Sequence, residues 1–234
     1  IRASWISIIG DATLSMSKIF VGIIAGSIAV LGDGIDSATD VVISIVTLFT
    51  ARIVTRPPNN NYAYGYEKAD TIAAKVLSFV IFFAGMQMLI SSGKNILFAV
   101  PRDLPSIIAI YVTLFSMIGK LGLAYYQFRQ GKLAGSPMLI ANAKNMRNDV
   151  IISAGVLVGL FFTFYLDMPI LDSITGLLIS LYIIRSAIHI FMESNVALMD
   201  GVKDTSIYTK IFEAVEKVPG ACNPHRVRSR MIGN

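Results

Sequence analysis

The sequence of 234 residues contains little cysteine and little charge. Its single cysteine, Cys222, excludes an intrachain disulfide and a metal site built on a Cys-x-x-Cys pair. Only 15% of the residues are charged, whereas soluble domains have about one quarter. This shortage of charge argues against an ordinary water-soluble domain.

Apolar residues make up most of the sequence. They account for 54% of the chain, and the mean hydropathy is +0.65. The net charge is +5 and the pI is about 9.3. A basic chain this apolar is not expected to bind nucleic acid, and its positive residues are better interpreted as charges in cytoplasmic loops. The composition therefore predicts that the protein lies in a lipid bilayer.

Six segments are long enough to cross a membrane, which takes about 20 mostly apolar residues. Gly32 and Gly34 lie near the first break between them, and proline, glycine or asparagine mark the later breaks. The predicted fold is an all-α membrane protein with spans at 3–30, 31–53, 69–90, 104–128, 144–166 and 169–192.

Loop charges predict the orientation of the chain. The second loop carries Arg56 and Lys68, and arginines and lysines also gather in the fourth loop and after the sixth span. The opposite side has only Lys94 and Arg102. By the positive-inside rule both termini of this multi-pass membrane protein are predicted to be cytoplasmic. If the source is a prokaryote, the membrane is the cell membrane.

The last part of the chain has a different composition. Ile207, Ile211 and Val215 recur at helical spacing among charged residues, which predicts an amphipathic helix outside the membrane. We expect a transmembrane domain over 1–200 and, over 201–234, the beginning of an incomplete cytoplasmic domain. Because residue 1 is Ile1 and not methionine, we also expect the natural chain to start upstream.

Two polar pairs lie inside the predicted spans. Asp36 and Asp40 are four residues apart and share one face of the second span. Asn145 and Asp149 repeat this spacing on the fifth. An ionisable residue inside a membrane helix suggests a functional site, and two close carboxylates would not both stay ionised there without a cation between them. The pairs therefore predict a four-ligand cation site, although interhelical hydrogen bonding is an alternative.

Several motifs resemble, in order along the chain, those of the cation diffusion facilitator family. Residues 33–40 read D-G-I-D-S-A-T-D, similar to the family's D-G-x-[HD]-S-x-x-D. Residues 64–70 (Y-G-Y-E-K-A-D) resemble F-G-H-G-K-A-E, and 145–149 (N-M-R-N-D) resemble H-x-x-S-D. Further similarity is found at 18–20, 26–27, 171–172, 218–220 and 225–228.

The resemblance implies a homodimer with six spans per subunit that exchanges a metal ion for protons. It also implies that the protein is a transporter and not an enzyme, with no cofactor other than the transported metal. Asp36, Asp40, Asn145 and Asp149 fall on the family's four transport-site ligands. Lys68 and Asp200 match a charge pair at the hinge of the family's dimer, although an ordinary surface lysine and a solvated aspartate remain an alternative.

The departures from the family pattern concern the choice of metal. Zinc transporters of the family usually have histidine at the position of Asn145, and often at that of Asp36. Here all four predicted ligands are oxygen donors, which suit harder ions than imidazole does. We therefore expect Mn²⁺, followed by Fe²⁺, Zn²⁺ and Co²⁺.

Three further residues are secondary candidates. Asp33 lies close to Asp36 and either lines the mouth of the site or caps the helix start. His225 matches a family metal ligand, but a lone histidine is more often structural or exposed to solvent. Asp11 in the first span either pairs with Lys18 or lines the cavity.

Two other functions compete with transport. An intramembrane aspartyl hydrolase also needs two buried aspartates, for which Asp36 and Asp149 would serve, but it leaves Asp40 and Asn145 unexplained. A passive cation channel needs a wetted pore, and the third and fourth spans are too apolar to line one.

Overall fold

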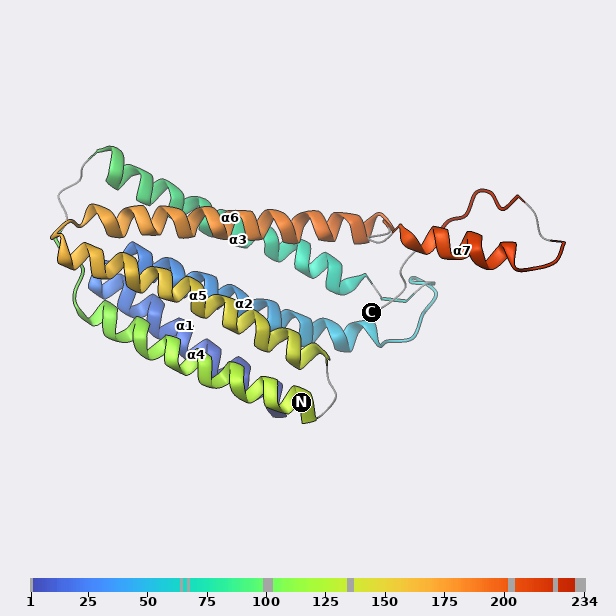
Figure 1. Cartoon of the computed structure of the whole chain (residues 1–234), viewed down its shortest axis with the longest axis horizontal. Helices are drawn as coiled ribbons and strands as arrows, with labels where there is room; N and C mark the ends of the chain where they lie inside the picture. The colour runs from blue at the N-terminus through green and yellow to red at the C-terminus, as the bar shows by residue number, and fades with distance from the viewer. Residues whose placement is uncertain are drawn as a thin grey trace. The chain divides into compact units, whose positions relative to one another are not determined.

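The protein is built from long α-helices. The computed structural model describes residues 2–63, 65–66, 68–98, 103–133, 137–201, 205–220 and 223–229, so Arg102 and Cys222 lie outside it, as do Tyr64 and Glu67 of the 64–70 motif. Six helices are long and apolar enough to span a membrane, and the described residues contain no strand, which confirms the predicted fold class (Figure 1). The helices are α1 (Arg2–Ala25), α2 (Ile28–Val54), α3 (Ala69–Leu97), α4 (Ile108–Leu133), α5 (Pro137–Tyr165), α6 (Ile170–Leu198) and the shorter α7 (Ser206–Glu216).

The chain divides into two compact units. The first consists of Ile1–Ile45 and Phe79–Ala187, and the second of Val46–Ser78 and Ile188–Asn234. Within the first unit, α4 packs against both α1 and α5 (Figure 1). The second unit contains α7, whose residues are all at least partly exposed.

Helix α1 shows why these sequences form a membrane bundle. Its buried side chains include Ser7, Asp11 and Lys18, whereas Met16 and Phe20 are among its exposed ones. Polar groups therefore lie inside and large apolar groups outside, the reverse of a water-soluble helix. This arrangement fits a lipid environment, in which apolar side chains face the lipid and polar side chains find partners within the protein.

The break between α1 and α2 is at Gly26 and Ser27. Gly26 has a φ of 69°, and the amides of Gly26 and Ser27 bond to the carbonyls of Ile23 and Gly22, which is the Schellman ending of a helix. Ser27 Oγ then accepts a hydrogen bond from Val30 N at 3.2 Å and caps α2. The turn thus closes one helix and starts the next within two residues.

Asp172 fixes this turn from α6. Its carboxylate accepts hydrogen bonds from Ser27 Oγ at 2.6 Å and from the amide of Ile28 at 2.8 Å. The first amides of a helix have no partner within the helix, so a carboxylate there satisfies an otherwise unpaired donor. Asp172 therefore connects the start of α6 to the start of α2.

The predicted position of the first break was wrong. Gly32 and Gly34 lie inside α2, in its second turn, and the break comes earlier, at Gly26 and Ser27. A Cβ added to Gly34 would lie 2.9 Å from the backbone nitrogen of Ile19, and one added to Gly32 would lie 2.5 Å from Met88 Cε. The lack of a side chain at both glycines lets other helices of the same chain approach α2 closely, so these glycines mark helix contacts and not a loop.

Helix α5 begins earlier than the predicted span. It starts at Pro137, whereas the apolar stretch suggested residue 144. Proline is favoured in the first turn of a helix because its missing N–H would have no partner there. The early start matters because it places Asn142 on the same helix as Asn145 and Asp149, at helical spacing from them.

Candidate metal-binding site

The two predicted polar pairs lie on two helices of the first unit. Asp36 and Asp40 are one turn apart on α2, and Asn145 and Asp149 are one turn apart on α5. The amide of Asn145 donates a hydrogen bond from Nδ2 to Asp40 Oδ1 at 3.4 Å. The structure therefore brings one member of each pair into contact across the two helices.

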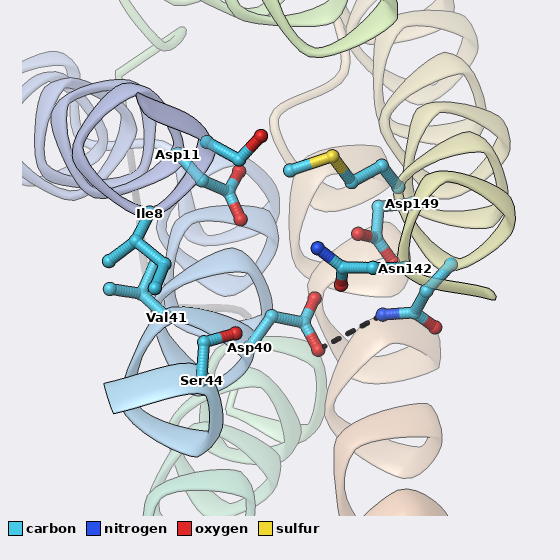
Figure 2. Close-up of a pocket in the computed structure, with 10 residues that line it drawn as sticks. Ile8, Asp11, Asp40, Val41, Ser44, Asn142 and Asp149 are labelled. Carbon is cyan, nitrogen blue, oxygen red and sulfur yellow. Dashed lines mark hydrogen bonds between the residues drawn. The ribbon is translucent and has the colours of Figure 1, made fainter. Parts of the chain in front are cut away.

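A pocket between α1, α2 and α5 contains three of the four predicted ligands, Asp40, Asn145 and Asp149. Asp11 and Asn142 also line it, and Figure 2 shows the side chains of Asp11, Asp40, Asn142 and Asp149 directed into the same space. The remaining lining residues are Ser7, Ile8, Val41, Ser44 and Met146. The pocket is thus rich in oxygen donors.

Asp36 does not line this pocket. It is half-buried and lies one turn before Asp40 on α2. Among the described residues, no three His, Cys, Asp or Glu side chains gather closely enough to hold a metal ion. A four-ligand site would therefore need side chains of α2 and α5 to turn toward one another from the positions observed.

Asp149 contacts a residue that the sequence reasoning missed. Lys120 on α4 is 1% exposed, and its Nζ lies 2.7 Å from Asp149 Oδ2 and 3.5 Å from Asp11 Oδ1. It also donates a hydrogen bond to Ser37 Oγ at 3.2 Å. The rule that singled out the aspartates, that a charge inside a span suggests function, applies equally to Lys120 and would have found it.

Asp33 belongs to a separate cluster. Its Oδ2 lies 2.8 Å from Lys18 Nζ, and its Oδ1 accepts a hydrogen bond from Ser153 Oγ at 2.9 Å. Lys18 in turn donates to Ser153 Oγ at 2.9 Å, which closes a triangle among α1, α2 and α5. Asp33 therefore does not line the pocket, and its ion-pair partner is Lys18. Of the two interpretations of Asp11, the structure favours the one that places it in the cavity.

The remaining candidates lie in the second unit. Lys68 Nζ is 2.9 Å from Asp200 Oδ1 and donates to the carbonyl of Leu198 at 3.0 Å. Both side chains are a little under half exposed, and Asp200 has a φ of 56°. His225 is exposed in an irregular segment, with Nδ1 3.0 Å from the carbonyl oxygen of Asn223.

Two further residues that the sequence reasoning did not suggest, Ser7 and Asn142, add oxygen atoms to the lining of the pocket. Ser7 Oγ is buried and has no hydrogen-bond partner in the described part of the chain. Asn142 donates from Nδ2 to Gln127 Oε1 at 2.8 Å, which fixes its amide between α4 and α5. Its position one turn before Asn145 and Met146 on α5 could have suggested it, since the polar spacing continues there.

Comparison with known proteins places the chain among cation transporters. The cation efflux transmembrane domain matches residues 4–199. The manganese efflux system protein MneS of Bacillus subtilis is 30% identical over 98% of this chain and 78% of its own length. The uncharacterized transporter YdbO of the same organism is 31% identical over 100% of this chain and 79% of its own. The magnetosome protein MamM of Magnetospirillum gryphiswaldense is 26% identical over 98% and 72%.

Proposed function

The chain belongs to the cation efflux family of multi-pass membrane transporters, and we propose that it exports a divalent transition-metal ion, with Mn²⁺ favoured, in exchange for protons. Members of this family are transporters and not enzymes, so the hydrolase alternative is set aside. The cation is the substrate of the protein, and the residues of α2 and α5 are the proposed ligands.

One observation carries the proposal. Asp40, Asn145 and Asp149 come from two helices that are far apart in the sequence, yet they line one pocket within a helical bundle whose exterior is apolar. Carboxylate and amide oxygens are ligands for hard divalent ions. We propose that Asp36 completes the set when α2 and α5 adjust around the ion, because it lies one turn from Asp40 on the same face of α2.

The donor set supports manganese over zinc. The four proposed ligands contain no imidazole or thiolate, and such all-oxygen sites suit Mn²⁺ better than softer ions. The relative MneS, at 30% identity, is a manganese efflux protein, which agrees with this choice. Fe²⁺ is the next candidate, followed by Zn²⁺ and Co²⁺, because the intrinsic affinity series of divalent ions does not by itself exclude zinc.

Proton exchange rests on the carboxylates. Asn145 does not take up a proton near neutral pH, so Asp36, Asp40 and Asp149 must exchange protons with the ion. Carboxylates that face each other in a site of low dielectric repel when the cation leaves, and a proton relieves that repulsion. Each inward proton also offsets one positive charge of the exported ion, which is worth roughly 2.3 kcal/mol per 100 mV.

The loop charges support a topology for the proposed carrier, and the family resemblance supports an assembly. The loop charges support cytoplasmic termini, and this orientation puts the start of α5 on the cytoplasmic side. Asn145, two turns into α5, is exposed, which supports entry of the ion from that side. We also propose that two copies of the chain form a homodimer in the bilayer, with the Lys68–Asp200 pair at its hinge.

Transport into proteoliposomes tests the proposal. Vesicles with an acidic lumen should accumulate Mn²⁺ through the wild-type protein, and collapse of the pH gradient with a protonophore should stop the accumulation. Asp40→Ala should abolish it. Asp70→Ala is a matched control, because Asp70 lies in the first turn of α3 and does not line the pocket. Accumulation that is independent of the pH gradient would instead indicate a channel.

A further inference from the structure

Lys120 is a buried cation that lies closer to the carboxylate of Asp149, a proposed metal ligand, than to that of Asp11. Its ammonium contacts Asp149 on α5 at 2.7 Å, Asp11 on α1 at 3.5 Å and Ser37 on α2 at 3.2 Å. A lysine inside a membrane span is costly and is retained only where other groups compensate its charge. Three helices provide this compensation, and two of the three groups, Asp149 and Asp11, line the pocket.

Lys18, the other buried lysine in the described part of the chain, provides a contrast. Lys18 pairs with Asp33 at 2.8 Å and bonds to Ser153 at 2.9 Å, and none of these three residues lines the pocket. Both lysines are about 1% exposed, so burial does not distinguish them. What distinguishes Lys120 is that it shares its carboxylate partner with the proposed cation site.

We propose that Lys120 is a built-in competitor cation, which opposes the transported ion at Asp149 and so speeds its release. This inference rests on the proposed function. A divalent ion bound to Asp149 lies within a few ångströms of the ammonium, and the repulsion between charges of +2 and +1 is twice that between two unit charges. The ion must therefore either displace Lys120 or bind against its charge, and its affinity is lower in both cases.

Such a competitor fits what a carrier needs. Three carboxylates and an amide, closed around a divalent ion in low dielectric, bind it tightly, and tight binding slows release. Transport requires binding that is strong enough for entry and weak enough for exit. The ammonium opposes the ion by charge repulsion and so lowers the affinity, whereas the proton exchange rests on the carboxylates.

The test is Mn²⁺ binding to the full chain in detergent, measured by calorimetry beside initial transport rates. Lys120→Met should bind Mn²⁺ roughly tenfold more tightly than the wild type, since the opposing charge is gone. Its half-saturating concentration and its maximal rate should both fall. Lys120→Arg keeps the charge and should bind Mn²⁺ within a few-fold of the wild type.

Lys120→Gln is the second variant, because a neutral amide still donates to Asp149 and supports the fold. It should also bind Mn²⁺ more tightly. The double variant Lys18→Met with Asp33→Asn removes the other buried ion pair and should leave the affinity unchanged. A gain in Mn²⁺ affinity is the informative result. If Lys120 only supported the fold or oriented Asp149, its replacement would lower the Mn²⁺ affinity of the protein.

Weaker or unchanged binding in the neutral variants overturns the inference, and so does failure of both to fold, which would make Lys120 structural. Asp40→Ala separates this outcome from failure of the proposed function. If the wild type binds Mn²⁺ and Asp40→Ala does not, the site stands and only the role of Lys120 is decided. If Asp40→Ala binds as the wild type does, the proposed site is wrong and the inference fails with it.

Discussion

Lys18 and Asp33 form an ion pair of 2.8 Å in which each side chain is about 2% exposed or less. Ser153 bonds to both residues, so one neutral cluster joins α1, α2 and α5. These same three helices line the pocket that contains Asp40 and Asp149. The cluster therefore stabilises the contact among these three helices, although none of its residues lines the pocket.

Loss of one member of this pair should destabilise the bundle strongly. Lys18→Met leaves the carboxylate of Asp33 buried and without its cation, and such a change costs about 3–5 kcal/mol. We expect a clear fall in the thermal unfolding midpoint, measured by size-exclusion chromatography of heated samples in detergent. Lys18→Met combined with Asp33→Asn should recover most of the loss, because no uncompensated charge remains. A single variant as stable as the wild type would contradict this role.

Gly34 should not tolerate a side chain. An added Cβ would lie 2.9 Å from the backbone nitrogen of Ile19, and a backbone atom cannot turn away as a side chain can. Gly34→Ala should separate α1 from α2 and destabilise the protein by about 1–3 kcal/mol. Gly155→Ala is the control on α5, since a Cβ there meets nothing within 4 Å. Equal unfolding midpoints for the two variants would show that the close approach is unimportant.

The sequence predicted the helical content better than the breaks. Six apolar segments were enough to predict six spans, because a bilayer admits few other backbones. Gly32 and Gly34 were assigned to a loop region because glycine is common in turns, and a single sequence does not distinguish that use from close helix packing. The actual turn at Gly26 depends on Asp172, which lies 145 residues away from Ser27.

The candidate site was predicted in part. Spacing alone placed Asp40 with Asp36 and Asn145 with Asp149, and the structure brings Asp40, Asn145 and Asp149 to one pocket. The spacing of residues within one helix does not show which other helices pack against it. The contacts of Lys120 with α1, α2 and α5, and the pairing of Asp33 with Lys18, therefore became visible only in three dimensions.

Asn145→His should change the metal preference. Imidazole suits Zn²⁺, and it replaces the only neutral oxygen donor among the four proposed ligands. We expect the ratio of Zn²⁺ to Mn²⁺ transport to rise by about tenfold, measured in competition between the two ions in proteoliposomes. Asn148→His is the matched control, because Asn148 is on the same helix and does not line the pocket. A similar change in both variants would argue against Asn145 as a ligand.

Mn²⁺ binding should weaken as the pH falls. Metal ligands must be deprotonated, so protons and the ion compete for the carboxylates and binding releases protons. We expect the Mn²⁺ affinity to decrease steadily with acidification and protons to appear in a weakly buffered solution on addition of Mn²⁺. Asp36→Asn should release fewer protons per ion than the wild type. An affinity that does not vary with pH would contradict the exchange of protons for metal.

The pairing of Lys68 with Asp200 makes a modest prediction for stability and a stronger one for transport. A pair this exposed contributes about 0–1 kcal/mol, so Lys68→Ala should hardly change the unfolding midpoint. If the pair acts at a hinge, the same variant should slow transport. Exchange of the charges, Lys68→Asp with Asp200→Lys, should restore part of the rate. No recovery in the exchanged variant would remove the proposed role of the pair.

The most direct test of the proposed site is to locate the ion. Protein crystallised with Mn²⁺ should give an anomalous difference peak between α2 and α5, within coordination distance of Asp36, Asp40, Asn145 and Asp149, and this peak should be absent in Asp40→Ala. Mn²⁺ bound elsewhere in the bundle, with those four side chains directed away from it, would contradict the account.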